Sequence, residues 1–166
     1  MKIYHPLGDI ESVNVILSRI SVWGGLTEEQ QKKIYKRLEV GTFTKGEYIF
    51  RKGEQPTHLY LVRSGSVEII TSDEEVSIHK ETVTAGGSFG VAALIAMQTS
   101  SVTAVALEDS EIIVLSRKAL LDLRHQDTEL FALLMMNVAR ELARKLLSTD
   151  NMLLQHMHEA HGHDNE

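Results

Sequence analysis

Residues 58–71 read HLYLVRSGSVEIIT, two apolar runs joined by the dipeptide Ser64-Gly65. Both runs are short and rich in aromatic, β-branched and other apolar side chains, and such runs between turn residues are typical of β-strands. Glycine adopts a positive φ without steric cost, so Gly65 suits a reversal of chain direction. The stretch therefore predicts two strands, His58–Arg63 and Val67–Thr71, joined by a tight turn.

The same pattern of short β runs and turn residues continues on both sides, through residues 39–116. Turn sequences such as Lys45-Gly46-Glu47 separate the runs. This spacing favours a sandwich or barrel over alternating strands and helices. Residues 91–97, VAALIAM, break the pattern and predict a short buried helix inserted between strands. The further strands that we expect are Tyr48–Phe50, Val76–Val83, Val102–Leu107 and Glu111–Leu115.

The N-terminal part carries helical signals. Apolar residues recur at three- and four-residue spacing from Ile10 to Ile20, and Thr27–Gln30 has the form of a capping box that opens a helix through Arg37. The predicted fold is α+β but mainly β: a double-stranded β-helix (jelly-roll) barrel with N-terminal helices, an inserted short helix and a long C-terminal helix. Its expected divisions are residues 1–38 (helical segment), 39–116 (barrel core), 117–158 (C-terminal helices) and 159–166 (His-rich tail).

A long helix is predicted after a short one over residues 118–124. Asp127 or Thr128 can cap it, and no glycine or proline interrupts the sequence up to about Met157. We expect the start of this helix to pack on the barrel and the later part to pair with a second chain, which predicts a homodimer. The expected seam follows the 4-3 spacing of a coiled coil, with Thr149 as its weak position: Met135, Ala139, Leu142, Leu146, Leu153 and Met157.

Composition and charge exclude several classes of protein. The 166 residues are 43% hydrophobic and 24% charged, which is ordinary for a folded domain. There is no cysteine, so disulfides, iron–sulfur clusters and thiol catalysis are excluded. No apolar run reaches the roughly 18 residues of a membrane span, and the N-terminus lacks the features of a secretion signal, so we expect a cytoplasmic protein. The net charge of −6 argues against nucleic-acid binding.

Six stretches in one order make the chain resemble the cyclic-nucleotide-binding domain family, which includes catabolite-activator and fumarate–nitrate regulators and kinase regulatory subunits. The resemblance covers roughly residues 16–149. It implies a regulatory sensor domain rather than an enzyme. The stretches are LTEEQ (26–30), FTKGEYIF (43–50), KGE (52–54), LYLVRSGSV (59–67), AGGSFG (85–90) and ALEDSEIIVL (106–115).

The family holds its ligand in a cassette that begins with Phe-Gly-Glu, continues through a short helix and ends in Pro-Arg-Ala/Ser-Ala. Backbone amides and the arginine hold the phosphate, and the glutamate accepts a hydrogen bond from the ribose hydroxyl. Here residues 89–102 read FGVAALIAMQTSSV. Val91 takes the place of the glutamate, and Thr99-Ser100 fall where the Pro-Arg pair is expected. The frame is kept and both key side chains are replaced.

The ligand-binding residues implied by the resemblance are uncharged. Loss of one partner of a buried charge pair costs on the order of 2–5 kcal/mol, so cyclic AMP and cyclic GMP should bind weakly. The pocket is either adapted to a neutral, less charged or apolar small molecule, or degenerate and kept as a packing element. The candidate residues, which offer backbone amides and hydroxyls, are Phe89, Gly90, Val91, Ala92, Ala93, Thr99, Ser100 and Ser101.

The sequence also leads to predictions on how the domain passes on its signal and on where a metal could bind. The chain ends at Glu166 without room for the helix-turn-helix domain of the family's transcription factors, so we expect output through a dimer or a protein partner. A cupin-like metalloenzyme is a weaker alternative, because the barrel zone offers only His58 and His79. The tail histidines are weak metal candidates: His156, His158, His161 and His163.

Overall fold

The computed structural model describes residues 2–8, 20–55, 57–72 and 77–162, and within it two antiparallel sheets pack face to face. Their layout confirms the expected mainly-β jelly-roll class. In spatial order the first sheet is β1 (His5–Pro6), β2 (Leu38–Phe43), β9 (Ser110–Ser116), β4 (His58–Ser64) and β7 (Ser88–Phe89). The second sheet is β3 (Tyr48–Phe50), β8 (Thr103–Ala106), β5 (Ser66–Ser72) and β6 (Ser77–Thr84).

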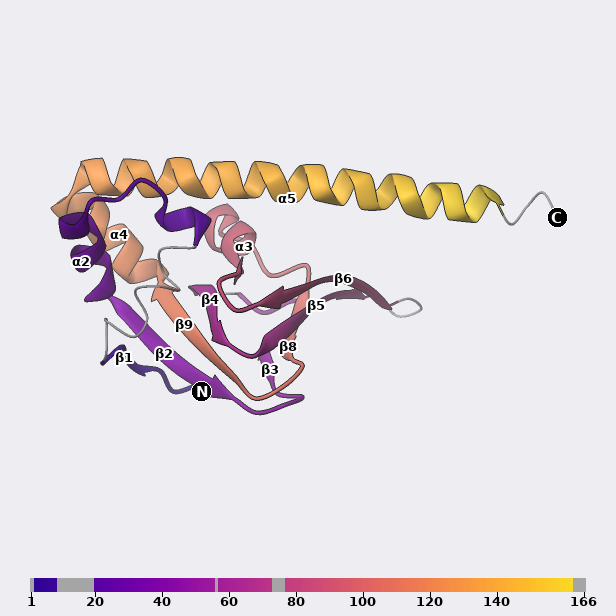
Figure 1. Ribbon diagram of the computed structural model, residues 1–166, viewed down its shortest axis with the longest axis horizontal. Helices are drawn as coiled ribbons and strands as arrows, with labels where there is room; N and C mark the ends of the chain where they lie inside the picture. Colours follow the sequence, from indigo (N-terminus) through magenta and orange to yellow (C-terminus); the bar gives the residue numbers. More distant parts are fainter. Residues whose placement is uncertain (1, 9–19, 56, 73–76, 163–166) are drawn as a thin grey trace.

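Helices cover the outer face of the first sheet. Figure 1 shows α5 running along the whole molecule, with the sheets beneath most of its length and its last turns extending beyond them. None of the described helices combines the length and the apolarity needed to cross a membrane. The helices are η1 (Ser21–Trp23), α2 (Glu28–Tyr35), α3 (Val91–Ala96), α4 (Arg117–Gln126) and α5 (Thr128–Gly162).

Strand β4 separates two hydrophobic cores. Successive side chains of a strand point to opposite faces of the sheet. Leu59 and Leu61 accordingly join the core under the helices, and Tyr60 and Val62 join the core between the two sheets. Strand β9 alternates in the same way in register with β4. A strand that is apolar on both faces appears in the sequence as a nearly continuous apolar run. The run from which we predicted the strand His58–Arg63 is of this kind.

Local signals in the sequence form as expected. Gly65 has φ +83°, and a Cβ there would lie 2.2 Å from the Ser110 hydroxyl oxygen, so the turn between β4 and β5 requires glycine. The capping box of α2 is present, with Gln30 N donating to the Thr27 hydroxyl at 3.3 Å. Asp127 caps α5, because its Oδ1 accepts a hydrogen bond of 3.0 Å from Leu130 N.

The N-terminal segment differs from the expected helical one. Strand β1 pairs with β2 through His5 opposite Val40, and α2 ends at Tyr35 rather than at residue 37. The expected helix from Ile10 lies outside the described residues, apart from its last member, Ile20. At the other end α5 continues to Gly162, beyond the expected boundary at residue 158. An uninterrupted helical sequence leaves no local stop signal before that glycine.

Helix α5 is anchored to the N-terminal segment by a buried amide. The side-chain nitrogen of Asn137 donates to the carbonyls of Val22 at 3.1 Å and of Gly24 at 2.8 Å. Because Asn137 is buried, these bonds fix where α5 crosses η1. Trp23 packs in the core under the helices. This position brings the middle of α5 over the inserted helix α3.

Candidate functional site

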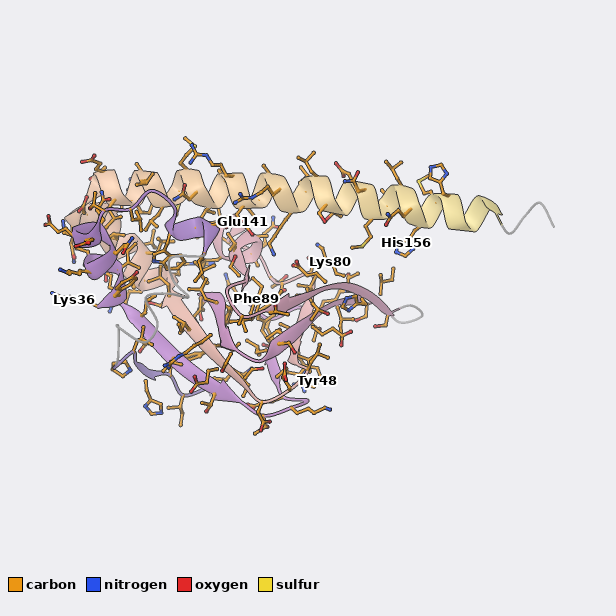
Figure 2. The ribbon with its side chains drawn as sticks, viewed as in Figure 1. Lys36, Tyr48, Lys80, Phe89, Glu141 and His156 are labelled. Atoms are coloured by element: carbon orange, nitrogen blue, oxygen red, sulfur yellow. The ribbon has the colours of Figure 1, made fainter. Side chains whose placement is uncertain are left out.

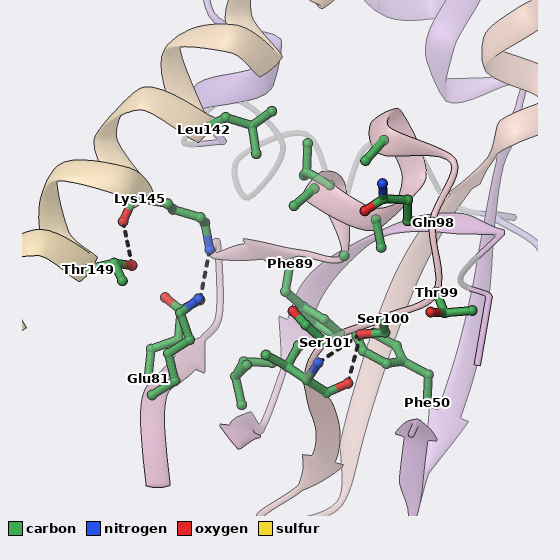
Figure 3. Close-up of a pocket in the computed structure, with 18 of the residues that line it drawn as sticks. Phe50, Glu81, Phe89, Gln98, Thr99, Ser100, Ser101, Leu142, Lys145 and Thr149 are labelled. Atoms are coloured by element: carbon green, nitrogen blue, oxygen red, sulfur yellow. Dashed lines mark hydrogen bonds and ion pairs between the residues drawn. The ribbon is translucent and has the colours of Figure 1, made fainter. Parts of the chain in front are cut away.

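A cavity of about 400 Å³ lies between α3, the loop that follows it, the sheet core and α5. Its walls are mainly apolar, with a few polar groups, which is the usual character of a small-molecule site. Figure 3 shows α5 on one side and the loop of residues 98–102 on the other. The full lining is Phe50, Ile69, Lys80, Glu81, Phe89, Gly90, Val91, Ala92, Ala93, Ala96, Gln98, Thr99, Ser100, Ser101, Val102, Leu142, Lys145, Leu146 and Thr149.

The structure brings all eight candidate ligand-binding residues to this one cavity. They come from β7, from α3 and from the loop before β8, which the fold places side by side. Figure 2 shows Phe89 in the interior of the molecule beneath α5. The spacing of the cassette therefore gives the lining of the site, whereas the role of each side chain in binding stays a prediction.

Gly90 gives the cassette its shape. The residue has φ +80° and is the N-cap of α3, so it turns the chain from β7 into the helix. A Cβ at this position would lie 2.6 Å from the ring of Tyr60. Any other residue would meet both the backbone strain and this ring. The backbone frame of the cassette is thus maintained without the charged side chains of the family.

An aromatic cluster forms the floor of the cavity. The rings of Tyr60 and Phe89 are stacked at a centroid distance of 5.1 Å, and Phe50 lies 6.0 Å from Phe89. Burial raises the pKa of the Tyr60 phenol, so this group stays neutral. A neutral aromatic floor favours a flat, apolar ligand surface.

Two of the predicted ligand-binding residues, Ser100 and Val91, are less available to a ligand than the sequence indicates. The Ser100 side chain is buried, and its hydroxyl donates to the Val102 carbonyl at 2.7 Å and accepts from Val102 N at 3.2 Å. Its donor is therefore satisfied within the loop. Val91 packs in the helix-facing core as well as against the cavity. Of the three expected hydroxyls, those of Thr99 and Ser101 belong to exposed residues.

Sequence reasoning missed the contribution of α5, which lines the cavity with Leu142, Lys145, Leu146 and Thr149. Lys145 Nζ donates to Glu81 Oε1 at 2.9 Å and to the Ser88 carbonyl at 3.1 Å. These partners lie 64 and 57 residues away in the chain, so no local pattern links them. The sequence carried one signal of this contribution: Thr149 is a polar residue within the apolar stripe that was predicted for the helix.

The histidines do not converge. His58 lies on β4 with its ring 4.9 Å from that of Tyr4, and burial lowers its pKa. His79 lies on β6, in the other sheet, with Nδ1 2.9 Å from Glu68 Oε1. Within the described part of the chain no group of three or more potential ligands could hold a metal ion. This arrangement gives the cupin-like alternative no support.

The tail candidates lie at the far end of α5. His156 and His158 are exposed on the helix, and Figure 2 shows His156 well away from Phe89, which lines the cavity. The helix includes position 161, and His163 lies outside the described residues. A metal bound at the tail would therefore be separate from the site under α5.

The comparisons with known proteins agree with this fold. A family model described as "Cyclic nucleotide-binding domain" matches residues 40–127. The cAMP-dependent protein kinase regulatory subunit of Yarrowia lipolytica is 29% identical over 126 residues, which cover 74% of this chain and 32% of that protein. The chain spans about a third or less of the first curated relatives that it matches.

Solved structures show the same likeness. The catabolite activator protein of Thermus thermophilus matches with a TM-score of 0.71 and 28% identity, over 80% of this chain and 61% of that chain. A cyclic nucleotide-binding domain from Methylobacillus flagellatus matches with a TM-score of 0.77 and 22% identity, over 87% of this chain and 83% of that chain. The chain belongs to the cyclic nucleotide-binding domain family.

Proposed function

We propose that this chain is a regulatory sensor module that binds a small molecule in the cavity under α5 and signals through contacts of that helix. The observation that carries the proposal is that one cavity is lined by all eight predicted ligand-binding residues and is covered by α5. A helix that touches both a ligand and a partner surface can couple the two by differential contacts. The proposed role is regulatory, in line with the kinase regulatory subunit and the catabolite activator protein to which the chain is similar.

The ligand is recognised without the family's glutamate and arginine. Val91 is closed into the apolar core, and the Ser100 hydroxyl is bonded within its own loop. A cyclic phosphate at the cassette would lose water and gain no opposite charge there. We therefore expect cyclic AMP and cyclic GMP to bind with dissociation constants no tighter than about the high micromolar range, which corresponds to roughly −5 kcal/mol.

Output passes through the second half of α5, with a second copy of the chain as the partner. The helix has 35 residues and would be about 52 Å long at 1.5 Å per residue. Leu147 and Leu154 are exposed and seven residues apart, which is one coiled-coil repeat. Leu146 and Leu153 repeat the same spacing beside them. Burial of this double stripe in a homodimer would remove several large apolar side chains from water.

One specific observation favours a second candidate, an interaction domain without a ligand. The bonds between Ser100 and Val102 close the loop on itself, as in a packing element. Under this alternative the cassette has only a structural role, and α5 still carries the interaction. The cavity of about 400 Å³ favours the sensor over this alternative, because a packing element has no need to leave such a space.

Native mass spectrometry of freshly purified protein tests the proposal. We expect a dimer that carries a co-purified small molecule, and release of that molecule on denaturation. Substitution of Ala93 by tryptophan, which fills the cavity from α3, should abolish the added mass while the dimer persists. A parent protein without added mass, which also fails to bind members of a metabolite library in thermal-shift assays, would favour the interaction domain.

A further inference from the structure

The charge of the cavity lies on the side opposite the cassette loop. Lys80 and Lys145 contribute +2 and Glu81 contributes −1, so the lining residues carry a net charge of +1. Residues 98–102 on the other side are all uncharged. Helix α3 has only six residues, so its dipole adds little at the cassette end. The positive potential is therefore concentrated where β6 faces α5.

Lys145 is placed to hold an anion at this position. Its ammonium group has three donors, of which one goes to Glu81 and one to the Ser88 carbonyl. The side chains of Lys145 and Glu81 are 30% and 39% exposed, so the pair stands at the margin of the cavity rather than in the sealed core. An exposed pair of this kind is weak, and a ligand anion can replace the glutamate at small cost.

The neutral aromatic floor lies within the same cavity. Phe50 and Phe89 line it, with Tyr60 stacked behind Phe89. Ile69 and Val102 complete an apolar wall. In Figure 3 the Lys145 ammonium points toward Glu81, and Phe89 lies toward the centre of the site. A ligand that fits both features has a flat aromatic body and one anionic group at its α5 end.

We propose that the cavity binds a planar aromatic molecule with a single anionic group, and that Lys145 binds this anion in competition with Glu81. The inference rests on the proposed function and adds the chemical class of its ligand. The proposed orientation of the ligand is opposite to the one expected from the cassette. The anionic group faces α5 instead of the cassette loop, and the aromatic part lies on the aromatic floor of the cavity. Exchange of Glu81 for the ligand would release Lys145 from β6 and give α5 a ligand-dependent contact.

A pair of fluorescent probes with the same aromatic skeleton tests the inference: anilinonaphthalene sulfonate, an anion, and phenylnaphthylamine, its neutral counterpart. We expect both to bind in the cavity and the anion to bind more tightly. Lys145→Met should weaken the sulfonate about tenfold and leave the neutral probe within about twofold. Lys145→Arg should restore the sulfonate, and Glu81→Gln should strengthen it by removing the competing carboxylate.

Three controls locate the probes. Ala93→Trp should block both, because it fills the cavity. Leu121→Gln alters an exposed side chain of α4, away from the cavity and from the exposed stripe of α5, and should change neither. Lys118→Met removes a positive charge from the exposed surface of α4 and should also change neither. Circular dichroism of each variant shows that the fold is retained.

The outcomes separate the two proposals. If both probes bind, Ala93→Trp blocks them and Lys145→Met affects neither, the anion site is wrong and the ligand cavity stands. If Ala93→Trp leaves both probes bound, the cavity itself is not the site and the proposed function fails with it. Selective loss of the sulfonate in Lys145→Met, with rescue by arginine, supports the inference.

Discussion

The two halves of α5 have the same secondary structure and opposite surroundings. In the first half Leu130 and Leu134 are 0% and 2% exposed, whereas in the second half Leu147 and Leu154 are 64% and 55% exposed. The sequence of both halves is equally rich in leucine. A helical sequence therefore does not show what the helix packs against. Whether a leucine of α5 is buried depends on the surface that lies opposite it.

The boundary between the halves is the part of the helix to which we assign the proposed function. Leu142, Lys145, Leu146 and Thr149 line the cavity there, after the buried turns and before the exposed ones. A ligand that contacts these residues acts on the helix at the point where intramolecular packing ends. The exposed half then lies next to the site along one rigid element, which is the simplest route for a signal to a partner.

The largest expected effect is on the stability of the protein, which should respond differently to substitutions in the two halves of α5. Leu134→Ala should lower the free energy of unfolding by about 2–5 kcal/mol, because it leaves a cavity in a core that cannot collapse around it. Leu147→Ala removes the same atoms from an exposed position and should change the intrinsic stability by less than about 0.5 kcal/mol. Urea denaturation followed by circular dichroism measures both.

A dimer adds a concentration-dependent contribution, so each variant is unfolded at two protein concentrations. The deficit of Leu134→Ala should persist at both, whereas any deficit of Leu147→Ala should shrink on dilution. Equal and concentration-independent deficits would show that the second half packs on its own chain, and the contrast between the halves would be lost.

The next effect is on oligomeric state. Leu147→Glu combined with Leu154→Glu should convert the expected homodimer to a monomer with an intact fold, because four like charges would face each other in the interface. Sedimentation equilibrium gives the masses, and Leu121→Glu on α4, at a side chain that is also exposed, is the matched control. Leu142 belongs to the stripe predicted from sequence, but it is half-buried against the protein's own core and unsuitable for this test.

A monomeric parent protein, or a double variant of unchanged mass, would contradict the dimer. The first result would leave the exposed stripe to a different protein partner. The second would move the interface to another surface of the molecule.

A smaller effect is expected at the cassette, on the side of the cavity opposite α5. Ser100→Arg should improve the affinity for cyclic AMP about tenfold over a weakly binding parent, because it supplies the missing charge at the phosphate end. Ser100→Gln, which is uncharged, should give no gain. Addition of Val91→Glu should lower stability, because Val91 is buried in the core. Isothermal titration calorimetry measures the affinities.

Tight binding of cyclic AMP by the parent would contradict the interpretation of the cassette, since other residues would then hold the phosphate. Absence of any gain in a folded Ser100→Arg variant would show that the loop is closed by shape rather than short of charge. That result would favour the packing role of the cassette.

Short-range signals in the sequence predicted most of the fold. The turn at Gly65 and the caps at Thr27 and Asp127 each depend on residues within a few positions, so they can be recognised without the tertiary structure. Strand β1 could not be predicted, because a two-residue strand is stabilised by its pairing with β2 and not by its own sequence. The cassette spacing gave one wall of the site, since Phe89 and Ser101 are close in the chain.

The other wall required the structure. Lys145 reaches the cavity because α5 packs across the molecule. The bonds of Asn137 that help to fix this crossing join residues 115 and 113 positions apart. The internal bonding of Ser100 depends on a loop conformation that its residue types do not specify. The cassette residues of the site could therefore be predicted from the sequence. The charged residue Lys145 could not, because it belongs to a segment that is distant in the chain.

The smallest expected effect concerns the end of the exposed half, where the tail histidines are found. Successive residues of an α-helix are about 100° apart, so positions 156 and 158 lie on different sides of α5. Positions 158 and 161 are three residues apart and share a face, which is the spacing at which two imidazoles can bind one ion. We expect weak nickel or zinc binding that requires His158 and His161 and has no need of His156.

Calorimetric titration of nickel into His158→Gln and His156→Gln variants tests this assignment. The first should lose most of the binding and the second should retain it, because only the first breaks the pair on one helix face. A chain ending at Gln155 should also lose most of the binding, and its mass should still be that of a dimer if Leu147 and Leu154 carry the interface. Tight binding retained in that shortened chain would place the metal within the barrel, where His58 and His79 lie in different sheets, and would revive the cupin-like alternative. Binding lost together with the dimer would instead show that the end of α5 acts as one unit with the rest of the exposed half.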